Sequence, residues 1–338
     1  MPDATDVKLM PVWSAIKNDA GRLQESEITY RRVTKGVDVW ASIDHEGYYD
    51  LLIKTESDDY DFPSWRGMKF DLINDPIRNT GNSIRLRDEN LQEVPDEIFV
   101  HICEELVRQL KETEPPGHQE AIGFFLEKWS SFFKQHGSNG LSDEKQRGLF
   151  GELFWLRKLL ENNIDPSVVL KSWKGQERAY HDFDIKGYAV EVKTTISKAV
   201  KKIKISNERQ LDDKGFESLR LFVLALMVSE GGGESLPEII SSVREKILSS
   251  PRASNRFEGQ LYSAGYLPAH ENRYTSTYTP TNGEEGELFI VREGFPRITE
   301  TQLPDGVGDI SYSVSMAHLD DFKTETDVCV SEIRGIIR

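Results

Sequence analysis

The stretch HDFDIKGYAVEVK, residues 181–193, predicts two short strands joined by a two-residue turn at Lys186-Gly187. Counting back from that turn places Asp182 opposite Glu191, and residues opposite each other in an antiparallel pair point to the same face. Residues two apart on one strand also share a face. The sequence therefore predicts a polar face with Asp182, Asp184, Glu191 and Lys193 and an apolar face with Phe183, Ile185, Val190 and Val192.

The predicted polar face gathers three carboxylates and one ammonium group. Like charges placed opposite each other destabilise a hairpin, so a cation bound between them would explain the arrangement. Mg²⁺ prefers oxygen ligands. A metal ion with a lysine beside it can catalyse phosphodiester hydrolysis, because the metal binds the phosphate and lowers the pKa of the attacking water. The alternative is a solvated polar face without chemistry. Asp184, which is predicted to lie opposite Ala189, fits that alternative best.

The segment SDEKQRGLFGELFWLRKLLEN, residues 142–162, predicts a helix before the hairpin. Its leading serine is a suitable N-cap, and its leucines recur at helical spacing and form an apolar stripe. Glu152 lies along that stripe and is expected to be partly buried, which costs free energy unless the carboxylate is paired or binds a metal. Pairing with Arg147 or Lys158 is the alternative.

Two glycines, Gly148 and Gly151, fall inside this predicted helix. Each costs about 1 kcal/mol relative to alanine in a helix interior. The close approach of another backbone to the helix would explain them.

The most basic run of the chain follows the hairpin. It carries Lys198, Lys201, Lys202 and Lys204. Such a run beside a metal site fits contacts to phosphate groups. A solvated edge strand protected by lysines is an equally good interpretation.

The elements predicted over residues 143–228 follow one another in a definite order. Gln210 opens a helical segment, and LRLFVLALMV, residues 219–228, predicts a buried central strand. The predicted order is helix 143–162, strand about 180–185, strand about 188–196, strand about 201–206, helix about 207–217 and strand 219–228.

Asp182 followed by Glu191-Val192-Lys193 resembles the D…(D/E)xK signature of the PD-(D/E)XK nuclease superfamily, with His181 where the family name has proline. The element order resembles the αβββαβ order of the restriction-endonuclease core, a mixed sheet flanked by helices of the α+β or α/β class. The segments LFGEL, DFDI…VEVKT, RQL, GFPRIT and ISYSV resemble a group of bacterial PD-(D/E)XK proteins of unknown function, found with restriction-modification and phage-defence genes.

The resemblance implies a metal-dependent DNA endonuclease and a role for each site residue. Asp182 and Glu191 would hold Mg²⁺, for which Mn²⁺ substitutes, and Glu152 in RGLFGEL would complete or orient the metal shell. Lys193 would orient the attacking water, and Gln210 would lie near the active site. The implied partners are DNA, a methyltransferase or ATPase subunit, and a second copy of the chain in a homodimer.

Composition sets outer limits on the function. The chain of 338 residues has a formal net charge of −15 and only two cysteines, which excludes a disulfide framework and a cysteine-based zinc site. It has no run long enough to span a membrane and no signal-peptide pattern, so we expect a cytoplasmic protein. A nuclease this acidic must bind DNA through a local basic groove or through a partner subunit that itself binds DNA.

Three segments are predicted along the chain: a β-rich N-terminal domain with a closing helix (1–112), a linker and helix (113–140), and a nuclease-like domain with C-terminal additions (141–338). The C-terminal additions comprise helices near 237–249 and 255–264, a loop over 272–287, and strands in ELFIVREGFPRIT and DISYSVSM. The arginines expected to face solvent on the N-terminal strands, with phosphate contact as the alternative, are Arg31, Arg32, Arg85 and Arg87. Arg297 is expected to bridge a turn, with phosphate contact as its alternative.

Two other functions remain open on the sequence. The chain could be a catalytically silent assembly or DNA-binding subunit of a defence complex that kept the nuclease fold. The complete D…ExK set argues against this, because an inactive relative has no need of Lys193. It could also be a structure-specific nuclease for repair, which a preference for junctions or flaps would reveal.

Overall fold

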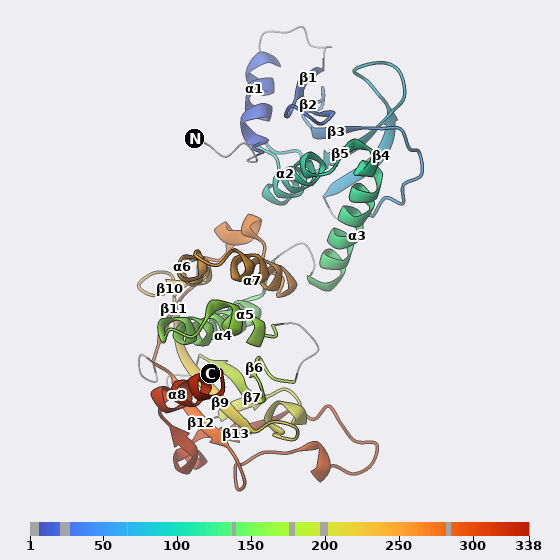
Figure 1. Ribbon diagram of the computed structural model, residues 1–338. Helices are drawn as coiled ribbons and strands as arrows, with labels where there is room; N and C mark the ends of the chain where they lie inside the picture. Colours follow the sequence, from blue (N-terminus) through green and yellow to red (C-terminus); the bar gives the residue numbers. More distant parts are fainter. Residues whose placement is uncertain are drawn as a thin grey trace. The chain divides into compact units, whose positions relative to one another are not determined.

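The computed structural model describes residues 7–20, 28–65, 67–136, 140–175, 180–196, 202–281 and 285–337. The chain forms two compact units, Met1–Asn139 and Gly140–Arg338 (Figure 1). The helix predicted for 119–136 belongs to the first unit. Among the described residues, no helix combines the length and the apolar character needed to cross a membrane.

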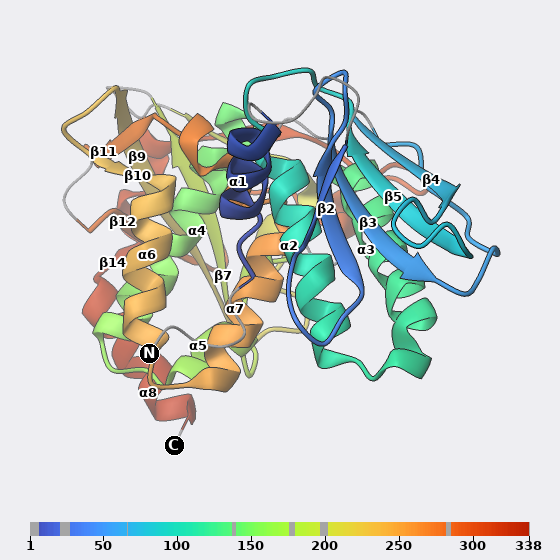
Figure 2. The ribbon, with the colours of Figure 1, turned by 90° about the horizontal axis from the view of Figure 1, so that it is seen from above.

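The N-terminal unit is built on a five-stranded antiparallel sheet with the strand order β1-β2-β3-β5-β4. Helices α1 and α2 lie on one face of this sheet (Figure 2). The sequence predicts a β-rich segment here, and the structure contains five strands, whereas α1 is not predicted. The elements are α1 (Met10–Ala20), β1 (Thr29–Arg32), β2 (Val39–Ile43), β3 (Tyr49–Thr55), β4 (Met68–Asn74), β5 (Asn82–Asp88), α2 (Glu97–Glu112), η1 (Pro115–Gly117) and α3 (His118–His136).

The C-terminal unit is a mixed α+β unit around the long strand β9, and α4 lies between the sheet and α6 in Figure 1. Its main sheet has the order β10-β11-β9-β12-β14, and the hairpin β6–β7 joins it through the pairing of β7 with β9. The helices are α4 (Asp143–Glu161), α5 (Pro166–Ser172), α6 (Leu236–Ile247), α7 (Pro251–Ser263) and α8 (Thr326–Ile337). The strands are β6 (Phe183–Ile185), β7 (Tyr188–Thr195), β8 (Lys202–Ile205), β9 (Ser218–Ser229), β10 (Glu234–Ser235), β11 (Thr277–Pro280), β12 (Glu287–Val291), β13 (Tyr312–Ser315) and β14 (Lys323–Thr324). Short 3₁₀ turns are η2 (Glu208–Leu211), η3 (Pro268–Arg273), η4 (Glu300–Gln302), η5 (Met316–His318) and η6 (Asp320–Phe322).

Strand β7 is buried on both of its faces. It runs parallel to β9, with Glu191 opposite Leu221, and parallel strands are typically covered on both sides. Val190 and Val192 pack into the core shared with α4. Ala189, on the other face, packs into a second core with the isoleucines of β8.

The third strand of the predicted αβββαβ order leaves the main sheet. Strand β8 pairs with β13 in a separate two-stranded sheet, with Ile203 opposite Val314. Its lysines Lys202 and Lys204 are exposed and its isoleucines are buried, as a half-buried strand requires. Lys198 and Lys201, predicted in the same basic run, lie outside the described residues.

Two other predictions for this unit are wrong. The helix expected over 207–217 is only the 3₁₀ turn η2, because the Asp212 side chain accepts a hydrogen bond from the Lys214 backbone and Gly215 adopts a positive φ of 89°. The segment 272–287, expected to be loop, contains β11, which pairs with the C-terminal half of β9. Helices α5 and α8 were not predicted.

Helix α4 approaches β7 closely at one of its two glycines. Ser142 caps the helix, as predicted, by accepting a hydrogen bond from the Lys145 backbone. A Cβ atom added at Gly151 would overlap the Thr194 side chain of β7, whereas one added at Gly148 would meet no atom within 4 Å. Close packing therefore explains Gly151, with side chains rather than backbone as the neighbours, and leaves Gly148 unexplained.

We predict opposite effects from alanine at these two positions. Gly148→Ala should raise the free energy of unfolding by up to about 1 kcal/mol through helix propensity. Gly151→Ala should lower it by about 1–3 kcal/mol, because the added methyl group overpacks the contact with β7. Urea unfolding followed by tryptophan fluorescence would measure both, and equal changes in the two variants would contradict the close approach.

Candidate functional site

The hairpin forms with the register that the sequence predicts. Phe183 pairs with Val190, and the turn residues Lys186 and Gly187 have φ of 51° and 89°, as a type I′ turn requires. Asp182 comes directly before β6, outside the ladder. Its Oδ2 accepts a hydrogen bond from the backbone N–H of Val192 at 2.7 Å, which fixes it beside β7.

Glu191 and Lys193 form an ion pair on one face of β7. Lys193 Nζ donates to Glu191 Oε1 at 2.6 Å. The Glu191 side chain is only 1% exposed, and that of Lys193 is 16% exposed. A buried carboxylate needs such a partner, because removing one member of a buried pair leaves an uncompensated charge.

Glu152 reaches the site from α4, and a residue that sequence reasoning missed holds it there. The indole Nε1 of Trp173 donates to Glu152 Oε2 at 2.7 Å. Trp173 directly follows the unpredicted helix α5 and forms a β-bridge with Phe183. The alternative of a structural pair with Lys158 does not occur, since Lys158 pairs with Glu285 at 3.4 Å. An indole after a short helix carries no sequence signal of this role.

The carboxylates of the site influence one another's protonation. Loss of hydration raises the pKa of Glu152 from its ordinary value of 4.5 to about 7, against the lowering effect of the hydrogen bond from Trp173. Burial and the charges of Glu191 and Glu152 raise the pKa of Asp182 well above its ordinary value. Asp182, Glu191 and Glu152 therefore share one electrostatic site, brought together from α4, from β7 and from the residue before β6.

The Lys193 ammonium stays protonated in this setting. Burial acts to lower its pKa, but the charges of Glu191 and Asp182 and the hydrogen bond to Glu191 outweigh that effect and raise the pKa above its ordinary value. Lys193 is therefore a positively charged hydrogen-bond donor at neutral pH and not a base.

His181, which stands where the family name has proline, is buried beside the carboxylates. Its Nδ1 lies 3.9 Å from Glu191 Oε2, and its ring meets Phe216 edge-on with 4.7 Å between ring centroids. Within the described part of the chain, neither ring nitrogen has a hydrogen-bond partner. The sequence indicated only a departure from the signature at this position.

The remaining predicted residues are engaged elsewhere. Gln210 Oε1 accepts a hydrogen bond from the Ser206 backbone at 2.8 Å, and the described residues show no hydrogen bond or ion pair between Gln210 and the carboxylates. Asp184 accepts from the Gly187 backbone within the hairpin turn, consistent with a bystander. Arg297 bridges a turn, as expected, by donating to Leu211 O at 2.7 Å and to Asp213 at 3.0 Å.

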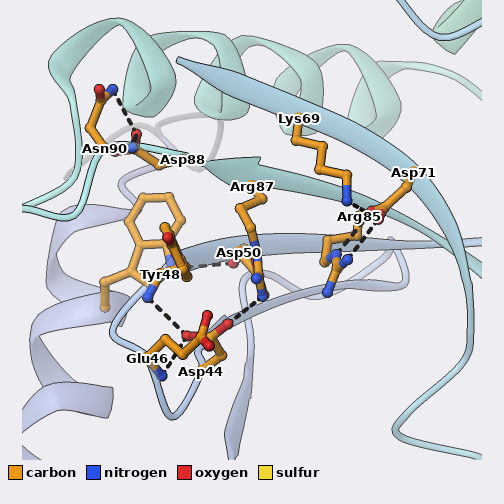
Figure 3. Close-up of polar contacts among 11 residues, drawn as sticks. Asp44, Glu46, Tyr48, Asp50, Lys69, Asp71, Arg85, Arg87, Asp88 and Asn90 are labelled. Carbon is orange, nitrogen blue, oxygen red and sulfur yellow. Dashed lines mark hydrogen bonds and ion pairs between the residues drawn. The ribbon is translucent and has the colours of Figure 1, made fainter.

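Three of the four arginines named above for the N-terminal strands bind carboxylates of that unit, and Figure 3 shows Arg85 and Arg87. Arg85 forms a bidentate ion pair with Asp71, with N···O distances of 2.6 and 2.9 Å. Arg87 pairs in the same way with Asp50 at 2.7 and 2.8 Å and also contacts Asp44 at 2.5 Å. Arg31 pairs with Asp19, and Arg32 donates to the Val37 carbonyl. These contacts account for the arginines as parts of the sheet's polar face.

The donor set fits a divalent cation, although its atoms are not arranged as a complete cage. In the described ranges, no group of three or more His, Cys, Asp or Glu side chains stands ready to hold a metal ion. Three neighbouring carboxylates nevertheless lie beside one ammonium group, and burial together with the charge of Glu191 raises the pKa values of Glu152 and Asp182. Mg²⁺ is commonly bound by one or two carboxylates together with waters and substrate phosphates, so it does not require such a cage.

We predict that the metal-free protein loses stability as the pH rises from about 4.5 to about 7. The folded pKa of Glu152 is raised, so the folded protein binds more protons than the unfolded chain in this window, and stability falls until Glu152 is ionised. Glu152→Gln should lose less stability between pH 5 and pH 8 than the wild type, as measured by urea unfolding in the presence of a chelator. Glu293→Gln, at an exposed position, is the matched control. An identical pH dependence in the wild type and Glu152→Gln would refute this assignment.

Comparison with known proteins gives one match. The family model described as "Putative PD-(D/E)XK family member, (DUF4420)" matches residues 10–317. No curated protein and no solved structure matches the chain. The matched range contains Glu152, Asp182, Glu191 and Lys193. Because it also spans most of the chain, the protein belongs to this PD-(D/E)XK family, whose description suggests a nuclease.

Proposed function

We propose that the protein is a metal-dependent DNA endonuclease. The observation that carries the proposal is the meeting of Glu152, Asp182 and the Glu191–Lys193 pair at one site, from three separate elements. This set contains the acidic groups and the single ammonium of the D…ExK signature. Membership of the PD-(D/E)XK family supports the same reaction class.

Asp182 and Glu191 would hold the metal, and Glu152 would complete or orient its surroundings. A bound Mg²⁺ would polarise the scissile phosphate and lower the pKa of an attacking water. The hydrogen bond from Trp173 holds the Glu152 carboxylate in place. The hydrogen bond from Val192 does the same for Asp182.

Lys193 would act through its positive charge. Its ammonium lies beside the carboxylates and stays protonated, so it can donate a hydrogen bond to the attacking water and stabilise negative charge that develops on the phosphate. Its pairing with Glu191 also keeps the buried carboxylate compensated before a metal binds.

The proposed setting is restriction of foreign or unmodified DNA, together with a methyltransferase or ATPase subunit, and with two copies of the chain supplying two active sites. This setting rests on the resemblance to defence-associated proteins. A repair nuclease with the same site would differ in preferring branched DNA over plain duplex.

We predict that metal binding and catalysis separate in two variants. The assay is cleavage of unmodified plasmid DNA with Mg²⁺ or Mn²⁺, alongside the metal-induced change in melting temperature. Lys193→Met should cleave roughly 100-fold more slowly or worse, as expected for loss of one stabilising donor, and keep the metal-induced rise in melting temperature, because its carboxylates remain. Asp182→Asn should lose both cleavage and most of that rise.

Lys145→Met, at an exposed position in the first turn of α4, is the control for loss of a lysine outside the site. It should cleave as the wild type does. If the wild type neither cuts DNA nor gains stability from metal, the catalytic proposal fails for the isolated chain. If it gains stability from metal but cuts only branched DNA, the repair function replaces restriction.

A further inference from the structure

A cavity in the C-terminal unit lies next to the segment that carries Asp182. Its volume is about 570 Å³, within the range of small-ligand sites. Its walls come from α5, from the first turns of α7, from the β6–β7 hairpin and from the end of α8. Figure 1 shows α5 and α7 close together beside β6.

The rim of this cavity is basic, in contrast to the acidic chain around it. Among the described residues that line it, the one carboxylate is that of Asp184, whose Oδ1 already accepts a hydrogen bond from the Gly187 backbone at 2.9 Å. The cationic side chains that line it are Lys171, Lys174, Lys186, Arg252 and Arg256.

Across the described ranges, none of these cations has a carboxylate partner. In the part of the chain that the structure describes, the side chains of Lys171, Lys174 and Arg252 take part in no hydrogen bond or ion pair. Lys186 donates to the Ile336 carbonyl at 3.0 Å, and Arg256 donates through Nε to the Leu170 carbonyl at 3.0 Å. Both are thereby fixed in position without being neutralised.

Two less exposed arginines of the same unit, in contrast, are neutralised by carboxylates. Arg157 pairs with Glu234, and Arg220 with Glu332 at 2.9 Å. Gathering five unneutralised cations around one cavity is electrostatically unfavourable unless an anion binds there. The arrangement therefore indicates an anionic ligand.

The apolar part of the cavity lining, here called its floor, requires an apolar group in the ligand. It is formed by Val168, Ile185, Ala253 and Ile337. The first turn of α7, which is capped by Ser250, lines the same space, and the N-terminus of a helix favours negative charge. A phosphate attached to a flat apolar body satisfies both the rim and the floor, and a nucleotide has this chemistry.

We propose that this cavity binds one nucleotide, with its phosphate at the basic rim and its base over the apolar floor. The nucleotide comes either from a nucleic-acid strand or from solution. The backbone N–H of Lys174 donates to Asp182 O at 2.8 Å, so the rim is joined directly to the candidate site. Binding requires no metal and no catalysis, so this inference can hold even where the endonuclease proposal fails.

The test measures binding of two probes without divalent metal: AMP, and a short fluorescent single-stranded oligonucleotide. The double variant Lys171→Gln/Arg252→Gln removes two rim charges at exposed positions. Its control is Lys145→Gln/Arg273→Gln, which removes the same charges at exposed positions outside the cavity. Melting curves verify that both variants fold.

We expect the rim variant to bind at least one probe about tenfold more weakly, while the control stays within about twofold of the wild type. For the oligonucleotide, the slope of log affinity against log salt should become shallower by about 1.4, the value for two lost phosphate contacts on a single strand. Loss of AMP binding assigns the cavity to a free nucleotide, and loss of oligonucleotide binding alone assigns it to a strand. Absence of binding by the wild type, or equal weakening in the two variants, would overturn the proposal.

Discussion

The ion pair between Glu191 and Lys193 is the interaction on which the candidate site depends. Both residues lie on the same face of β7, and the carboxylate is almost completely buried. A strand covered on both faces accepts a charge only if a partner accompanies it, and Lys193 is that partner two residues along the same strand. Burial raises the pKa values of Glu152 and Asp182, the charge of Glu191 adds to the rise, and the single ammonium of Lys193 opposes it without cancelling it.

The burial of this pair follows from the displacement of β8. The predicted αβββαβ order places this strand in the mixed sheet of the core. Instead β8 pairs with β13 and packs Ile203 and Ile205 into the core that also contains Ala189. The face that carries Glu191 is therefore covered, and a set of surface charges becomes a site with strong electrostatic coupling. The Gly151 contact acts in the same direction, because it lets α4 lie close to β7 and brings the neighbouring Glu152 to the site.

The parts of this arrangement that sequence could predict are those fixed by local rules. The turn at Lys186-Gly187 sets the register of the hairpin, and helical spacing places Glu152 on a half-buried stripe. Trp173 and the burial of His181 depend on which distant segments pack together, and neither alternation nor turn chemistry encodes that. The helix predicted over 207–217 is also too long. A side-chain hydrogen bond at Asp212 and the positive φ of Gly215 end the helical turn early. Hydrophobic periodicity cannot predict which strands β8 and β11 pair with.

The net charge of this chain does not predict whether it can bind a polyanion. At physiological ionic strength, charges more than about 8 Å apart are largely screened in solvent, so the charges that matter are those next to the ligand. In the N-terminal unit, Arg85 and Arg87 are neutralised by carboxylates that lie on the same sheet. In the C-terminal unit, Lys171, Lys174 and Arg252 have no carboxylate partner among the described residues and surround one cavity whose wall continues into the segment of Asp182. Positive potential is thus concentrated beside the carboxylates that would hold a metal, and an acidic chain can present a local basic surface to a phosphate without a basic overall composition.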